Sequence, residues 1–169
     1  INVHAPFHRN PMNWQQVCEH PSLQDLPFKI ELDGLGKIIM SPTRVFHGIY
    51  QAEIGHLLRS LRPEGQTVTE CAVQTTLGTK VADVAWASAE RAAEIGDVFD
   101  CSVAPGICVK ILSPGNSHAE MMAKKRAYFA AGAQEFWLCD EDGGMSFYLP
   151  PRKVRKSRLV PEFPEGVAP

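Results

Sequence analysis

Short runs of alternating hydrophobic and polar residues mark the regular part of the chain. The run FKIELDGLGKIIM at 28–40 predicts two short strands about an Asp33-Gly34 turn, because this dipeptide favours the positive φ of a tight hairpin. We expect a helix over 45–61, with His47 at the edge of its buried face. This helix is predicted because apolar residues recur at helical spacing along it: Tyr50, Ile54, Leu57, Leu58 and Leu61.

Two longer runs, QTVTECAVQTTLG and TKVADVAWAS, are rich in β-branched residues and meet near Gly78. They predict an antiparallel pair of strands, followed by a short helix over 89–95. The segment ICVKILSP is apolar on both faces except at Lys110, a pattern typical of a central strand covered on both sides.

The last regular elements are a helix and a hairpin. Ser117-x-x-Glu120 predicts a capping box at the start of a helix that runs to Ala131, and Gly132 ends it. QEFWLCD and MSFYLP then predict a hairpin around the acidic turn at 141–144. This order of elements predicts an α/β (α+β) fold in which a mixed β-sheet is flanked by helices.

The chain divides into three parts by composition. Residues 1–27 contain four prolines and predict an N-terminal extension with short helices only. Residues 28–150 form the expected domain, and residues 151–169 are a basic and then Pro-rich C-terminal tail. A length of 169 residues with 44% hydrophobic content fits one ordinary domain.

Cysteine usage and hydropathy restrict the class of protein. Five cysteines are present with no CxxC pair, so neither a disulfide framework nor a zinc ribbon is indicated, and we expect thiols in a cytoplasmic protein. His4 and His8 have i, i+4 spacing, but Pro6 lies between them and argues against a helical zinc pair. No apolar run reaches the ~18 residues of a membrane helix, so no membrane partner is expected.

A formal charge of −2 argues against a surface covered with phosphate-binding residues. Contact with a nucleic acid would therefore be local. The basic residues gather just after a Pro-Pro step, where they form either a solvated tail or a phosphate contact: Arg152, Lys153, Arg155, Lys156 and Arg158.

Lys110 is the first candidate for chemistry, because a lone charge inside a buried strand is costly unless it is paired. Asp83 and Glu70 interrupt the two preceding strands, so the three residues predict a common polar pocket. Lys124 lies on the same helical stripe as apolar neighbours and could reach over the sheet. The alternative is an exposed ion pair between Glu120 and Lys124.

Several of these motifs together resemble a bacterial family of restriction-endonuclease-like proteins, once catalogued as a domain of unknown function. The motifs are IIMSPT after Asp33-Gly34, then VADVAWAS, ICVKILSP and KKRAYFAAGAQEFWLCD, and the resemblance spans residues 28–149. It implies the PD-(D/E)XK nuclease fold, and hydrolysis of DNA phosphodiester bonds with Mg²⁺ or Mn²⁺ as cofactor.

The resemblance also implies roles for individual residues. Asp83 and Glu70 would hold the metal, and Lys124 would be the catalytic lysine that orients or deprotonates the attacking water. The family pattern has an acid at position 110, where this chain has Lys110. Glu120 is a possible substitute ligand, although its expected role in the capping box competes with metal binding.

Two hypotheses follow from this departure. The chain is either a Mg²⁺-dependent DNA endonuclease impaired by Lys110, or a pseudo-nuclease that binds DNA or protein without cleavage. His47 is a possible phosphate contact, and a structural histidine is the alternative. Nucleases of this architecture often cut as symmetric dimers, so a homodimer is expected, with the hairpin at 134–149 as a possible contact.

Overall fold

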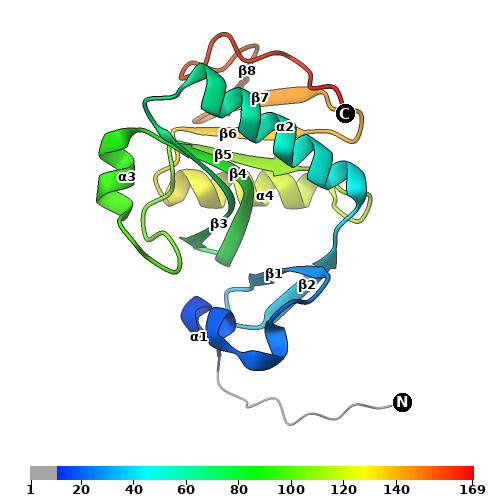
Figure 1. Ribbon diagram of the computed structural model, residues 1–169, viewed down its shortest axis with the longest axis vertical. Helices are drawn as coiled ribbons and strands as arrows, with labels where there is room; N and C mark the ends of the chain where they lie inside the picture. The colour runs from blue at the N-terminus through cyan, green and yellow to red at the C-terminus, as the bar shows by residue number, and fades with distance from the viewer. Residues whose placement is uncertain (1–10) are drawn as a thin grey trace.

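The computed structural model describes residues 11–169 (Figure 1). His4 and His8 lie outside this range. The described elements are α1 (Trp14–Glu19), η1 (Pro21–Leu23), β1 (Phe28–Leu32), β2 (Ile38–Pro42), α2 (Val45–Leu61), β3 (Gln66–Thr75), β4 (Gly78–Ala87), α3 (Ala89–Ile95), β5 (Ile107–Ile111), α4 (His118–Ala130), β6 (Glu135–Cys139), β7 (Met145–Leu149) and β8 (Arg152–Val154). Within this part of the chain, no helix is both long and apolar enough to cross a membrane.

Six strands form the main sheet in the order β3-β4-β5-β6-β7-β8. Every neighbouring pair is antiparallel except β5 and β6, which are parallel because α4 crosses over between them. β1 and β2 form a separate antiparallel sheet. The mixed sheet flanked by helices that the sequence predicts is confirmed.

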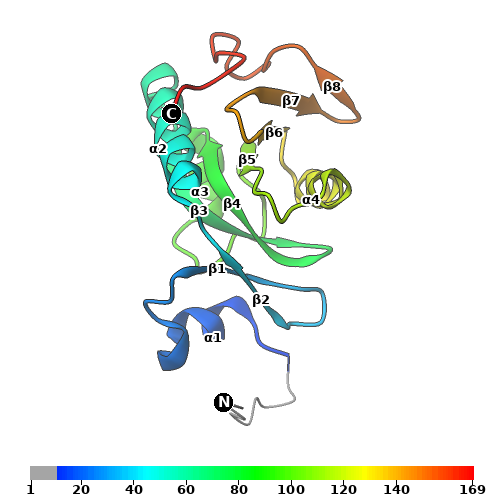
Figure 2. The ribbon, with the colours of Figure 1, turned by 90° about the vertical axis from the view of Figure 1, so that its right-hand side faces the viewer.

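Helices α2 and α4 cover opposite faces of the main sheet (Figure 2). On one face, Tyr50, Ile54 and Leu58 of α2 pack against apolar side chains of the central strands. On the other face, Met121 and Tyr128 of α4 pack against a second cluster. Alternation along β5 turns Ile107, Val109 and Ile111 toward α2, which leaves Cys108 and Lys110 for the face of α4.

Two local predictions need correction. The positive φ of the first hairpin is at Gly36, not Gly34, because the five-residue loop is organised by Asp33, whose carboxylate accepts from the backbone N–H groups of Leu35 and Lys37. The capping box at α4 is only half formed. Ser117 accepts from the Glu120 N–H, but the Glu120 side chain lies near Asn116 and Lys124 instead.

The β1–β2 hairpin docks on the end of the main sheet, beside the turn between β3 and β4. Gly78 has a φ of +91° and lies against the carbonyl of Asp33, so a Cβ at this position would collide with the hairpin. Lys80 donates to the Leu32 carbonyl oxygen over 2.8 Å. These contacts fix β1 next to β4.

The segment after β8 has no helix or strand, as expected of an extended tail, yet it belongs to the core. Val160, Phe163 and Val167 are buried in the cluster beneath α2. Glu135 in β6 holds this segment in place, because its buried carboxylate accepts from the Trp137 ring N–H, the Ser157 hydroxyl, and two backbone N–H groups at 158–159, all within 2.7–2.8 Å.

We expect Glu135→Ala to destabilise the protein by about 3 kcal/mol, because it leaves two buried and two part-buried donors without an acceptor. Urea unfolding measures this cost, and limited proteolysis should detect early cleavage after residue 154. The matched control is Glu162→Ala, whose exposed carboxylate pairs with Arg62 at 3.1 Å and should contribute less than about 1 kcal/mol. Equal stability of the two variants would contradict this role for Glu135.

Candidate functional site

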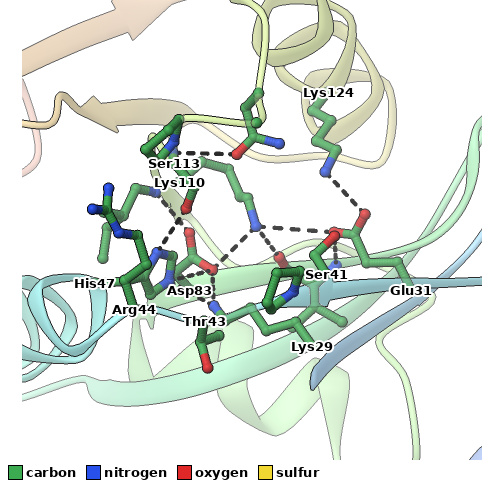
Figure 3. Close-up of a pocket in the computed structure, with 16 residues that line it drawn as sticks. Lys29, Glu31, Ser41, Thr43, Arg44, His47, Asp83, Lys110, Ser113 and Lys124 are labelled. Atoms are coloured by element: carbon green, nitrogen blue, oxygen red, sulfur yellow. Dashed lines mark hydrogen bonds and ion pairs between the residues drawn. The ribbon is translucent and has the colours of Figure 1, made fainter. Parts of the chain in front are cut away.

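A cavity of about 430 Å³ lies where the β1–β2 hairpin meets the ends of β4 and β5 (Figure 3). The N-terminus of α2 and the side of α4 complete its wall. The polar and charged side chains that line it come from all of these elements and from the loop after β5: Lys29, Glu31, Ser41, Thr43, Arg44, His47, Asp83, Lys110, Ser113, Asn116 and Lys124.

Asp83 lies at the base of this cavity and is fully buried. The antiparallel register pairs Val84 with Val109, so one step further along Asp83 faces Lys110 on the same side of the sheet. Its Oδ1 accepts from the Lys110 ammonium over 3.1 Å and from the Lys29 ammonium. Its Oδ2 accepts from the backbone N–H of Ile111 over 2.7 Å.

Lys110 extends from β5 into the space between the two buried acids (Figure 3). Its Nζ donates to the Val81 carbonyl oxygen over 2.8 Å and to Asp83, and lies 3.9 Å from Oε1 of Glu31. The ion pair with Asp83 that the sequence suggests is therefore present. The ammonium of Lys110 thus lies between two carboxylates.

Lys124 reaches down from α4 to Glu31, and its Nζ lies 2.9 Å from Oε2 of that carboxylate. Oε1 of Glu31 accepts from the backbone N–H of Val81 over 3.0 Å. Glu120 also lies 3.4 Å from Lys124, but Lys124 itself is buried. The i, i+4 pair between Glu120 and Lys124 is therefore present, but it is exposed only on the side of Glu120, and Lys124 makes its shorter contact with the buried Glu31 of β1.

Lys29 connects β1 to three other elements. Its ammonium contacts Asp83 in β4, Glu70 in β3 over 2.9 Å, and Nε2 of His47 in α2 over 2.8 Å. Because an ammonium can only donate, Nε2 of His47 is the acceptor in this contact. The remaining hydrogen of the ring is then on Nδ1, which lies 3.3 Å from the Ser113 hydroxyl.

The two remaining candidates, Glu70 and Glu120, lie at the margin of the site. Glu70 does not line the cavity, since its backbone has a φ of +53° and its side chain is 45% exposed. It reaches Asp83 only through Lys29. Glu120 is 43% exposed and contacts Lys124 and Asn116, so the structure brings it to the rim and not to Asp83.

The charges at the base of the cavity hold one another in the ionised state. Burial raises the pKa of the Asp83 carboxyl, but the Lys110 and Lys29 ammonium groups outweigh it and hold that pKa well below its ordinary value. Burial likewise raises the pKa of Glu31, and Lys110 and Lys124 lower it overall. Burial lowers the pKa of Lys110, but Asp83 and Glu31 outweigh it and the pKa is raised.

These donors do not fit the divalent cation that the sequence resemblance implies. Mg²⁺ requires several free oxygen ligands, and the oxygens of Asp83 and Glu31 already accept from ammonium or backbone N–H groups. Three lysine side chains surround them. Within residues 11–169, no three His, Cys, Asp or Glu side chains are arranged so that they could hold a metal ion.

Lys29 and Glu31 are the site residues that the sequence analysis misses. Both are charged residues two positions apart in the strand FKIEL, so they face the same side of β1. This alternation was the available signal. It does not tell which element the charged side would meet, because that depends on how the hairpin docks.

Comparison with known proteins gives the context for this site. A solved structure with a similar fold is described as "a putative nuclease belonging to DUF820" from Anabaena variabilis. It is 19% identical, has a TM-score of 0.66, and the alignment covers 84% of this chain and 82% of that chain, so the likeness is one of fold. None of the curated proteins matches the chain.

A family model matches residues 14–165, which extends beyond the 28–149 region where the sequence motifs show their resemblance. The match covers nearly all of the chain, including the hairpin that carries Lys29 and Glu31 and most of the segment after β8 that packs in the core. The chain therefore belongs to the Uma2 family, which is described as "Putative restriction endonuclease".

Proposed function

We propose that this chain is a nuclease-type protein that acts on DNA and whose phosphodiesterase centre is impaired because Lys110 stands where an acid is expected. The single observation that supports the proposal is the position of the Lys110 ammonium, 3.1 Å from Asp83 and 3.9 Å from Glu31. An acid at position 110 would instead add a third carboxylate to the floor of the cavity. The family to which the chain belongs supplies the expectation of DNA as substrate.

The size of the electrostatic change supports impairment. Exchange of a carboxylate for an ammonium changes the charge at one point by two units. At ~4 Å and an effective dielectric of ~20, each pair of unit charges interacts by ~4 kcal/mol. A change of this size outweighs the binding free energy of a weak divalent-cation site, since 1.4 kcal/mol is a factor of ten in affinity.

A pseudo-nuclease that binds DNA or protein without cleavage is the second candidate. It is favoured by the pairing of both buried acids with lysines, because the charges on the floor of the cavity then balance one another without a metal ion. In this case Lys110 is a structural residue. The two candidates differ in what happens when an acid is placed at position 110.

We expect Lys110→Glu to bind Mg²⁺ or Mn²⁺ at least tenfold more tightly than the parent chain and to nick plasmid DNA. The reason is that the substitution frees Asp83 from one ammonium and adds a ligand beside it. Calorimetric titration measures the binding and a plasmid assay measures the cleavage. The double variant Lys29→Ala/Lys110→Glu removes the second ammonium on Asp83 and should bind more tightly still.

The control for this experiment is Lys156→Glu, which makes the same change of charge at an exposed position outside the cavity lining. It should behave as the parent chain. If both Lys110 variants remain folded and neither binds a divalent cation nor cuts, the nuclease assignment of this site is wrong. If they bind the cation without cleavage, the pseudo-nuclease is the better description.

We expect Lys110→Ala to lower the free energy of unfolding by about 3 kcal/mol, because one buried member of an ion pair is removed and Asp83 loses a donor. Lys156→Ala should change it by less than about 0.5 kcal/mol. Chemical denaturation compares the two. An unchanged unfolding midpoint for Lys110→Ala would contradict the proposed structural role of the pair.

Stability should also depend on acid pH. The pKa values of Asp83 and Glu31 are lowered in the folded protein, so their contribution is complete above their ordinary values of ~4. It is lost progressively as the pH falls from about 5 toward the folded-state values. Urea unfolding between pH 6 and pH 3 should show this loss, and Lys110→Met should show a shallower one. Equal slopes would contradict the coupling of Lys110 to Asp83.

A further inference from the structure

We propose that Cys71 and Cys101 are a site of reversible oxidation, at which a peroxide converts two free thiols into one disulfide. Both cysteines are unbonded in the structure, and neither lines the cavity that holds Asp83 and Lys110. The inference requires neither DNA nor a metal ion. It is therefore independent of the proposed function, and either can fail while the other stands.

The fold brings the two sulfur atoms together from positions 30 residues apart. Cys71 lies in β3, and Cys101 lies in the irregular segment between α3 and β5, which runs beside β3 (Figure 1). Two backbone hydrogen bonds of 2.9 Å hold that segment, because the Cys101 N–H donates to the Ala72 carbonyl oxygen and the Gln74 N–H donates to the Cys101 carbonyl oxygen. The two Sγ atoms lie 3.7 Å apart, so the thiols are in direct contact.

Only a small movement separates this contact from a disulfide. Bonded sulfur atoms lie ~2.05 Å apart, so the two must approach by about 1.7 Å. Rotation about a Cα–Cβ bond moves a cysteine sulfur over such a distance. Residues 96–106 belong to no helix or strand, so they can adjust to the new position of Cys101 without loss of regular structure.

The hydrogen bond between the thiols makes one of them the better nucleophile. Donation from the Cys71 thiol lowers the pKa of Cys101 against the opposing effect of burial. The same hydrogen bond, together with burial, raises the pKa of Cys71. Since the thiolate is the form that attacks an oxidant, Cys101 is the residue that is oxidised first and Cys71 is the one that completes the disulfide.

A cavity of about 270 Å³ gives a small oxidant access to both sulfur atoms. Both cysteines line it, together with residues of α3 and of the segment that follows. Val98 and Phe99 belong to this lining and are each 51% exposed, and Cys71 and Cys101 each retain 7% exposure. A peroxide molecule, with two oxygen atoms, is small enough to enter.

The other buried cysteines lack these features. Cys108 has no exposed surface, its thiol donates to the Pro105 carbonyl oxygen over 3.9 Å, and burial raises its pKa. Cys139 is also without exposed surface, and burial raises its pKa to about 12. Neither thiol lines the cavity beside α3. We expect both to stay reduced, so they are internal controls for the reaction.

The reaction balances with a peroxide as the oxidant. The Cys101 thiolate attacks one oxygen of hydrogen peroxide, the O–O bond breaks, and the departing hydroxide takes up the proton that the thiol had released, which leaves a sulfenic acid. The Cys71 sulfur then attacks the Cys101 sulfur, the S–O bond breaks, and water leaves with the proton of the Cys71 thiol. Two thiols lose two electrons in all, and the peroxide becomes two water molecules. A dithiol reductant reverses the change by thiol-disulfide exchange.

The disulfide would also change stability, because it closes a loop that contains β4 and α3. A crosslink restricts the unfolded chain more than the folded one. We expect the melting temperature of the oxidised protein to be higher by about 5 °C than that of the reduced protein. The rise should disappear on addition of dithiothreitol.

The first experiment uses the parent chain, reduced with dithiothreitol and then freed of it. The folded protein is treated with a small excess of hydrogen peroxide, the remaining thiols are blocked with N-ethylmaleimide in urea, and unreduced peptides are mapped by mass spectrometry. We expect one linked pair of peptides, joined through Cys71 and Cys101. Cys108 and Cys139 should carry the maleimide label.

Cys71→Ser tests the order of the two steps. The serine hydroxyl can still donate to the Cys101 sulfur but cannot form a disulfide with it, so a sulfenic acid should accumulate at Cys101 and be trapped by dimedone. Cys18→Ser is the matched control, because it removes an exposed thiol in α1. It should form the disulfide as the parent chain does.

The linked pair in both the parent chain and Cys18→Ser supports the proposal. Cys71 and Cys101 that stay reduced, or linkage of either one to Cys108, overturns it. A bond that forms only in urea overturns it as well, because the contact in the fold would then have no part in the reaction. An oxidised protein that melts no higher than the reduced one shows that the fold does not accommodate the bond, and so counts against the proposal. These results come from the parent chain and do not depend on the folding of Cys71→Ser.

Discussion

A carboxylate with no contact to solvent has to be neutralised by its neighbours, and the donors to Asp83 come from two other strands. β1 supplies Lys29, and β5 supplies Lys110 and the Ile111 N–H, while His47 of α2 is held beside Asp83 through Lys29. The positions of these elements relative to β4 are therefore coupled through one charge. The hairpin, the central strands and the first turn of α2 meet where this charge is balanced.

Most of the secondary structure could be predicted from the sequence, because each element carries a local signal. The apolar stripe of α2 gave its bounds, the β-branched runs gave β3 and β4, and Ser117 gave the start of α4. Lys110 could be singled out since a charge inside a buried strand needs a partner. Its pairing with Asp83 follows because β4 and β5 are neighbours, and the order of the strands along the chain and the alternation of side chains within each strand make that pairing foreseeable.

The parts that could not be predicted depend on docking between distant segments. Glu31 meets Lys124 across 93 positions, and nothing local to either residue indicates that contact. Phe163 and Val167 look like part of a Pro-rich tail, yet they are buried because Glu135 anchors the preceding residues. Glu70 lies in β3, next to the strand of Asp83, as expected, but its left-handed backbone breaks the alternation of side chains along the strand, and no sequence rule predicts that conformation.

The hairpin that carries Lys29 and Glu31 is a separate two-stranded sheet, joined to the larger one by side chains and not by a shared ladder. Lys29 and Glu31 therefore lie on one side of a seam between the two sheets, and their partners Asp83, Lys110 and Lys124 lie on the other. Local opening of this seam would separate these charges without unfolding the main sheet, and a ligand that contacts both sides would oppose the opening and slow hydrogen exchange there. Binding at this cavity would therefore also stabilise the junction between the two sheets.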